Sequence, residues 1–286
     1  MKKEVVSLFC VFALLGGTTA AFAGAYGEKE QPEELPASPP PAPMMESAPA
    51  PAPAKVLREY FGFMTDAETA RGLWAEVGSI YSAESDFGGD VDFVDTNLKL
   101  AYGQEMWEVG ASIGYDYIHL DSSSTFSGGS DDGFNDLKLW GKVIPLRTDM
   151  FQAGLGLVTS FPTGNDPFTT DEYGFEPFVT VGVGAGPASL RGSFGYMTST
   201  GHGDDTLDTE VALLGSVADW VNLRAEVLWL HALDVDFDPV TLAPGIDFVF
   251  PVADGWDLLV RPQGGVGLDE DAPDWQLGVS LAITQS

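Results

Sequence analysis

From Gly72 to the C-terminus, apolar and polar residues alternate with a period of two, and no helical period appears. In the segment 221–229, one phase holds valine, leucine, alanine and tryptophan, and the other holds asparagine, arginine and glutamate. Successive side chains of a strand point to opposite faces, so each segment presents one apolar and one polar or small-residue face. This pattern predicts a chain built from strands.

The alternating segments predict twelve strands, at roughly 72–84, 92–103, 106–120, 134–145, 149–161, 174–186, 188–200, 207–218, 220–232, 241–252, 255–267 and 274–284. Short connections near 103–105, 146–148, 186–187, 218–219 and 253–254 alternate with long ones at 85–91, 121–133, 162–173, 201–206, 233–240 and 268–273. An even strand count with short turns and long loops in alternation is typical of a transmembrane barrel. Soluble sandwiches follow no such rule. We therefore predict an all-β fold, a transmembrane antiparallel up-and-down β-barrel of about twelve strands.

The N-terminal region predicts export rather than a core. Lys2 and Lys3, an apolar run and the small residues around Ala23 predict a bacterial signal peptide over 1–23. Residues 24–54 are rich in proline and alanine, which predicts a disordered, semi-rigid periplasmic linker. The alternative for this linker is a ligand for peptidoglycan or a periplasmic protein. Residues 55–71 are expected to form a short helix or a barrel-mouth segment, and 72–286 the barrel.

Charge excludes one class of partner. The formal net charge is -30, so the chain cannot neutralise a row of phosphates, and we expect no nucleic acid partner. Yet 44% of the residues are hydrophobic and the mean hydropathy is +0.05, which is too apolar for a disordered acidic chain. The apolar phase is therefore predicted to face outer-membrane lipid.

If the apolar side chains of each strand face lipid, the alternate side chains point into the barrel. Most of the basic residues are among these alternate positions. The candidates for lining the lumen are Lys99, Asp136, Lys138, Lys142, Arg191, Arg224, Glu226, Asp247 and Arg261. Two interpretations remain open: ion pairs that brace the interior, or groups that line a selective path. We expect an ion pair between Asp136 and Lys142, with Lys138 beside it.

The remaining acids cluster in the predicted long loops, where they form a solvated outer surface facing lipopolysaccharide. Calcium binding by these acids is the alternative, but no EF-hand pattern is present, and we predict no metal site and no cofactor. His119 and His231 lie near external strand ends, close in sequence to the serines at 122–124 in the first case. This leaves an outer-membrane lipid hydrolase as a remote alternative, although no catalytic motif is present and we predict no enzyme.

Two motifs carry a family resemblance. The segment 133–139 reads GFNDLKL, with Lys142 downstream, and the next predicted strand ends in Phe161-Pro-Thr-Gly. This series resembles the outer-membrane transporter family associated with the meta-pathway of phenol degradation. Phe161 replaces the usual leucine, and Asn135 stands where glycine is common. The motif residues are Gly133, Asp136, Leu137, Pro162, Thr163 and Gly164. The resemblance implies a barrel that passes small, often aromatic, molecules, and it supplies no catalytic residue.

These observations together predict an outer-membrane channel or transporter of a Gram-negative bacterium that passes a small, aromatic or hydrophobic solute, with its N-terminal segment in the periplasm. The alternative is a structural or envelope-anchoring barrel without an open pore. A barrel of this size can fill its interior with side chains, so twelve strands alone do not decide between the two.

Overall fold

The computed structural model describes residues 69–70, 72–84, 91–120, 129–148, 150–185, 187–201, 205–218, 220–233, 235, 237–269 and 271–285. The predicted signal peptide 1–23, the linker 24–54 and most of segment 55–71 lie outside these residues. Within them, no helix is long and apolar enough to cross a membrane. The strands are β1 (Gly72–Glu84), β2 (Val91–Gln104), β3 (Trp107–Leu120), β4 (Gly129–Phe134), β5 (Leu137–Arg147), β6 (Phe151–Phe161), β7 (Gly174–Ala185), β8 (Ala188–Ser199), β9 (Thr206–Ala218), β10 (Val221–Ala232), β11 (Val240–Ala253), β12 (Trp256–Gly267) and β13 (Trp275–Gln285).

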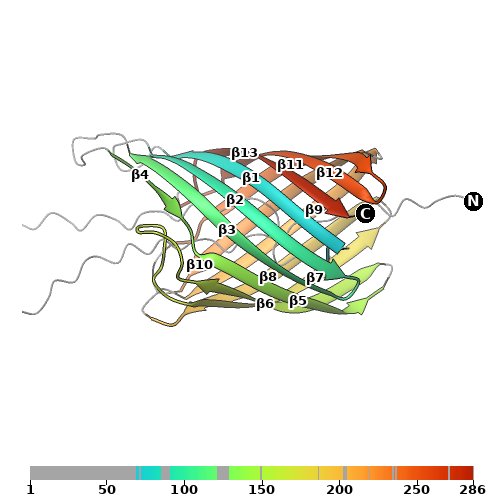
Figure 1. Ribbon diagram of the computed structural model, residues 1–286, viewed down its shortest axis with the longest axis horizontal. Coiled ribbons are helices and arrows are strands. Elements are labelled where there is room, and N and C mark those ends of the chain that lie inside the picture. Colours follow the sequence, from blue (N-terminus) through green and yellow to red (C-terminus); the bar gives the residue numbers. More distant parts are fainter. Residues whose placement is uncertain are drawn as a thin grey trace, which may run out of the picture.

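These strands form one closed antiparallel barrel (Figure 1). β1 pairs with β2 on one side and with β13 on the other, which closes the sheet. β3 pairs with both β4 and β5, which are two parts of one barrel strand. The barrel therefore has twelve strands, as predicted. Closure leaves no unpaired sheet edge, the condition that a sheet must meet to span lipid.

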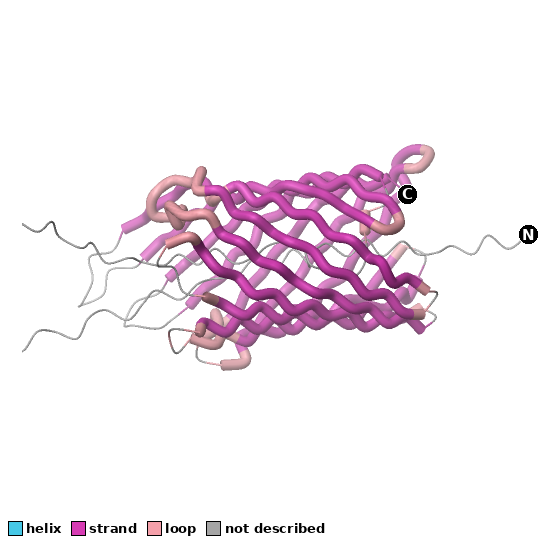
Figure 2. Tube along the Cα trace, turned by 90° about the horizontal axis from the view of Figure 1, so that it is seen from below, coloured by secondary structure: helices cyan, strands magenta, loops and turns pink. Residues whose placement is uncertain are grey.

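The connections alternate in length as predicted. Those after β2, β5, β7, β9 and β11 have two or three residues, and the other six are longer. Because each strand runs antiparallel to the one before it, the short turns gather at one end of the barrel and the long loops at the other. Figure 2 shows the tilted strands between these two ends.

Eleven of the twelve predicted strands agree with the structure within two residues at each end. The exception is the strand predicted at 134–145, which begins at Gly129 and is interrupted between Phe134 and Leu137. Its first part, GSDDGF, is polar and glycine-rich and lacks apolar alternation, so the sequence predicted a loop over 121–133 there.

The two faces of the wall differ in chemistry as predicted. Large apolar side chains such as Leu100, Leu155 and Leu281 are exposed on the outer face. The interior carries the buried polar and charged side chains, with only small apolar clusters among them. One of these clusters joins Ala70 and Trp74 to Leu259 and Ala282. Trp74 and Trp140 are both buried as well. The outer face thus matches lipid and the inner face matches water or paired charge.

Candidate functional site: the barrel interior

The inward phase of the strands brings the predicted charged residues into the barrel. All nine are buried: Lys99, Asp136, Lys138, Lys142, Arg191, Arg224, Glu226, Asp247 and Arg261. They do not form a single cluster. Six of them lie in three places: a network on β10 to β12, a contact near the short-turn end, and a loop attachment near the long-loop end.

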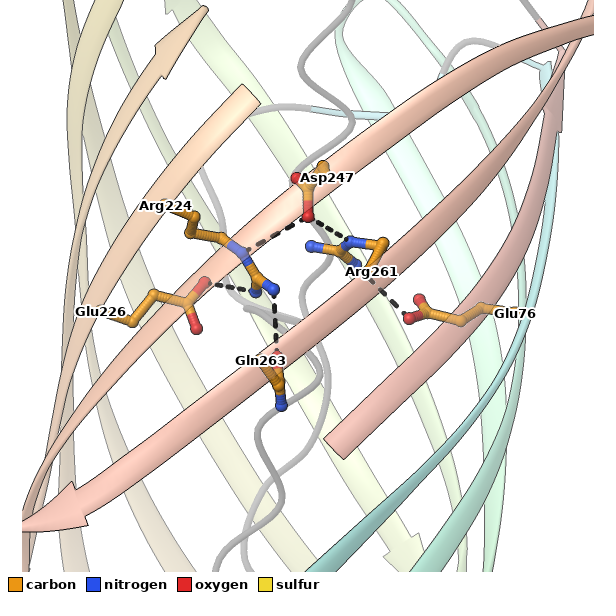
Figure 3. Close-up of polar contacts among 6 residues, drawn as sticks. All are labelled: Glu76, Arg224, Glu226, Asp247, Arg261 and Gln263. Atoms are coloured by element: carbon orange, nitrogen blue, oxygen red, sulfur yellow. Dashed lines mark hydrogen bonds and ion pairs between the residues drawn. The ribbon is translucent and has the colours of Figure 1, made fainter. Parts of the chain in front are cut away.

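The network contains both arginines of the β10–β12 wall (Figure 3). Arg224 Nη1 lies 2.9 Å from Glu226 Oε1, and its Nε lies 3.7 Å from Asp247 Oδ1. Arg261 Nε lies 3.0 Å from the same Asp247 oxygen. Asp247 therefore bridges the two guanidinium groups, which would otherwise repel each other at short range.

Two further groups extend this network around the wall. Arg224 Nη2 donates to Gln263 Oε1 at 3.0 Å, and Arg261 Nη1 lies 3.4 Å from Glu76 Oε1 on β1. Glu76 is separated from Arg261 by the whole of β13. The network thus ties together strands from both ends of the chain, across the point where the barrel closes. The predicted lumen-lining residues include neither Glu76 nor Gln263, although Gln263 shares the inward phase of Arg261 two residues away.

Lys142 belongs to a contact centred on Glu108 near the short turns. Lys142 Nζ lies 3.3 Å from Glu108 Oε1, and Trp140 Nε1 donates to the same oxygen at 2.9 Å. The backbone N–H of Ala70 donates to the other oxygen at 2.6 Å. Thr69 adds a hydrogen bond from its hydroxyl to the Gln104 carbonyl at 2.8 Å. Thr69 and Ala70, the two described residues before β1, are therefore held on the inner side of the wall.

A β-bulge directs Asp136 inward. Between the paired positions Tyr115–Phe134 and Ser112–Lys138, β3 has two residues whereas the opposing strand has three. An extra residue of this kind re-aims side chains. Here Asn135 and Asp136, although consecutive, are both buried. The bulge therefore places a carboxylate at the interruption between β4 and β5.

Asp136 binds the long loop between β6 and β7. Its Oδ1 accepts hydrogen bonds from the backbone N–H groups of Thr163 (3.1 Å) and Gly164 (3.0 Å) and from the Thr169 hydroxyl (2.8 Å). Its Oδ2 accepts from the N–H and the hydroxyl of Thr170, at 3.3 and 3.1 Å. We call this arrangement of Asp136 with residues 163–170 the loop clasp. A buried carboxylate is compensated here by hydrogen bonds instead of a cation.

The other residues of the sequence motif take part in the same unit. Leu137 N–H donates to the Thr163 hydroxyl at 2.9 Å. Gly164 lies so close that an added Cβ would come within 2.6 Å of the Phe134 carbonyl. Gly133 faces the buried ring of Phe168 in the loop, and Pro162 begins the loop directly after β6. Two motifs that are separate in sequence thus form one contact, which explains their joint occurrence in physical terms.

The predicted ion pair between Asp136 and Lys142 is wrong. Lys142 contacts Glu108, and Asp136 contacts the loop. Sequence phase placed both side chains inward correctly, but it could not show that a loop would return to the wall and supply N–H groups to the carboxylate. Lys99 and Lys138 lie on either side of Ser112 in the register, and Arg191 is opposite Ala212.

The two histidines considered for catalysis do not converge. His119 is on β3 and His231 is on β10. With β4 and β5 counted as one strand, five strands separate the two histidines in either direction around the barrel. His231 Nδ1 contacts Asp238, and Ser122 to Ser124 lie outside the described residues. Among the described residues, no group of three or more His, Cys, Asp or Glu is placed to hold a metal ion.

Comparison with solved structures supports the fold through the alignment with one outer membrane channel. The chain aligns with the COG4313 outer membrane channel from Pseudomonas putida F1 at a TM-score of 0.60 and 12% identity, over 77% of this chain and 97% of that one. The NanC porin aligns at a TM-score of 0.49 and 10% identity, over 75% and 100% of the two chains. The CymD monoaromatic hydrocarbon channel aligns at 0.40 and 10%, over 76% and 89%.

Sequence comparison adds no family. No family model matches the chain, and no curated protein matches it. The resemblance to the phenol-degradation transporters therefore stays a prediction from the two motifs. The chain has the fold of an outer-membrane β-barrel channel.

Proposed function

We propose that the protein is a channel of the Gram-negative outer membrane that passes a small solute through the barrel. The main observation behind this proposal is the difference in chemistry between the outer and inner faces of the closed barrel wall. Exposed apolar side chains cover the outside, and polar and charged side chains occupy the inside. Such a wall is stable in lipid and offers a polar route across it. The fold shared with an outer-membrane channel supports the same proposal.

The orientation follows from the topology. The short turns would face the periplasm and the long loops the exterior, where their acids would meet lipopolysaccharide. The N-terminal segment precedes β1, and β1 begins at the end of the barrel that carries the short turns. This segment would therefore be periplasmic. In that position the Pro-rich linker is a spacer, or a ligand for peptidoglycan or a periplasmic protein. The sequence resemblance favours a small aromatic or hydrophobic solute.

One observation favours the alternative, a structural barrel with a closed lumen. Arg224, Arg261 and their carboxylate partners are almost fully buried and engage one another, as in a wall brace. A network of this kind stiffens a barrel whether or not a solute passes. No arrangement of the described residues favours a lipid hydrolase.

Planar-bilayer recording of the full-length protein tests the proposal. Protein that shows heat-modifiable gel migration, and so is folded, should give discrete conductance steps. The matched control is the same preparation heated before reconstitution, which should give none. Folded protein with neither conductance nor solute flux into liposomes would overturn the channel and favour the structural barrel.

A further inference from the structure

The inner wall carries an excess of negative charge. Residues 72–286 contain 34 aspartates and glutamates but only seven lysines and arginines. Among the described residues the buried acids are Glu76, Glu84, Asp95, Glu108, Asp116, Asp136, Glu176, Asp208, Glu210, Glu226 and Asp247, and the buried bases are Lys99, Lys138, Lys142, Arg191, Arg224 and Arg261. Eleven acids thus face six bases, so the interior is acidic although nearly all the barrel's bases lie within it.

From this charge distribution we infer that the lumen favours cations over anions, and that the solute is neutral or positively charged. This inference rests on the proposed channel function and adds the class of solute. It narrows the aromatic solutes that the sequence motifs suggest, because an aromatic acid such as benzoate carries the disfavoured charge.

Two of the three buried arginines, Arg224 and Arg261, already bind carboxylates. Both guanidinium groups of the network contact Asp247, and each has a further carboxylate partner, Glu226 or Glu76. Lys142 is likewise paired with Glu108. An entering anion would have to displace an acid that the protein holds at ion-pair distance, and it would leave that acid buried without its cation. These bases therefore do not form an anion path.

The segment before β1 does not reverse this excess. Residues 55–71 contain three bases, Lys55, Arg58 and Arg71, and three acids, Glu59, Asp66 and Glu68. The segment is therefore neutral as a whole. Residues 24–54 contain one lysine and five glutamates. Wherever the N-terminal region lies, it adds no net positive charge to the barrel.

Two acids of the inner wall face each other directly. Asp95 on β2 is opposite Asp116 on β3, and both are buried. This pair therefore places two of the eleven buried acids at one point of the inner wall, which makes it a suitable place to test the effect of the negative charge.

An asparagine amide lies in the same part of the wall. Asn97 is opposite Gly114, and a Cβ added at Gly114 would meet the amides of both Asn97 and Asn135. The buried Asn135 side chain has no hydrogen-bond partner within the part of the chain that the structure describes. Its amide adds a donor and an acceptor to this part of the wall without adding charge.

The experiment is the reversal potential of the full-length protein in a planar bilayer under a potassium chloride gradient. A low-dielectric wall concentrates the field of fixed charges in the pore, and a potential energy of about 0.5 kT per unit charge already gives a roughly threefold preference for the counter-ion over the co-ion. We expect potassium to permeate about three times more readily than chloride or better, with the preference falling as salt rises because the fixed charges are screened.

A pair of double variants locates the effect. Asp95→Asn with Asp116→Asn removes two charges from the lumen and should move the permeability ratio toward one. Asp254→Asn with Asp274→Asn removes two exposed charges outside the strands and should leave the ratio unchanged. If the lumen variant lacks heat-modifiable migration, Glu210→Gln gives the same comparison with one buried charge.

The outcomes separate the two proposals. Conductance with equal permeability or a preference for chloride would overturn the inference and leave the channel standing. Conductance with a cation preference that both double variants reduce equally would overturn the assignment to the inner wall. Folded protein without any current would overturn the channel itself, and the inference with it.

Discussion

Two buried carboxylates on opposite sides of the barrel are compensated in different ways. Asp247 lies between two guanidinium groups that come from neighbouring strands, so its partners are fixed by strand register. Asp136 lies at a strand interruption and binds the N–H groups and hydroxyls of a loop. The first joins strand to strand, and the second joins a loop to the wall. Removing a group should therefore weaken the barrel in one case and release a loop in the other.

The largest effect is expected for Arg261→Met. The substitution removes the guanidinium group but leaves its partners Asp247 and Glu76 buried. Removing one partner of a buried ion pair typically costs about 3–5 kcal/mol. Urea unfolding in detergent micelles, followed by tryptophan fluorescence, should show a fall of that size in the free energy of unfolding. The effect should be global, because the network spans the closure of the barrel.

Two controls make this result specific. Arg147→Met removes a base that is only half-buried and donates to the Glu105 carbonyl, so its cost should be much smaller. Adding Asp247→Asn to Arg261→Met removes an uncompensated charge and should restore part of the lost stability. Equal losses for Arg147→Met and Arg261→Met would show that the network is no stronger than a surface contact.

Asp136→Ala should act locally. Five hydrogen bonds to the loop are lost, and a hydrogen bond to a charged group is worth about 1.5–3 kcal/mol, although bonds within one cluster do not add. We expect a loss of about 2 kcal/mol in the free energy that holds the loop closed, with a smaller change in global unfolding. Limited proteolysis should cut residues 162–173 faster in the variant.

The conservative variant Asp136→Asn tests the role of charge. It keeps one acceptor oxygen but introduces an NH₂ group towards donors of the loop, so we expect partial release. Proteolysis of the loop at the wild-type rate in both variants would contradict the clasp.

The packing of the clasp can be tested separately from its charge. Gly164→Ala would bring a Cβ to within 2.6 Å of the Phe134 carbonyl, whereas Gly215→Ala meets no atom within 4 Å. Overpacking commonly costs about 1–3 kcal/mol, and we expect about 1 kcal/mol for Gly164→Ala, since the loop can shift. The control should be near neutral in the same proteolysis assay. Equal cutting of the two variants would show that close approach at Gly164 is unimportant.

The sequence predicted the β10–β12 side of this comparison better than the clasp. Phase alone placed Arg224, Asp247 and Arg261 inward, because the alternation is unbroken around each of these residues. Which carboxylate contacts which arginine depends on the register between paired strands. The sequence of a single strand does not determine that register. At the clasp, a bulge shifts the phase between Gly133 and Asp136, and the partner is a loop 27 to 34 residues away. The motifs indicated that both segments matter, but only the folded chain shows that they touch.

A third carboxylate, that of the half-buried Asp205 just before β9, should show the smallest effect. Hydrogen bonds from Tyr196 and Thr198 hold the pKa of Asp205 below its ordinary value. A lowered pKa stabilises the folded state above the ordinary pKa, and this contribution is lost as the pH falls through the folded-state value. Tyr196→Phe should therefore lower stability slightly at pH 7 and leave it unchanged once the pH lies below the folded-state pKa. Urea unfolding of the wild-type protein and the variant across this pH range gives the comparison.

A stability difference that grew as the pH fell would show that the Tyr196 hydroxyl favours protonated Asp205. The expected loss of stability at neutral pH is small because solvent screens the interaction of Asp205. Asp247 and Asp136 are buried inside the wall and are not screened in this way.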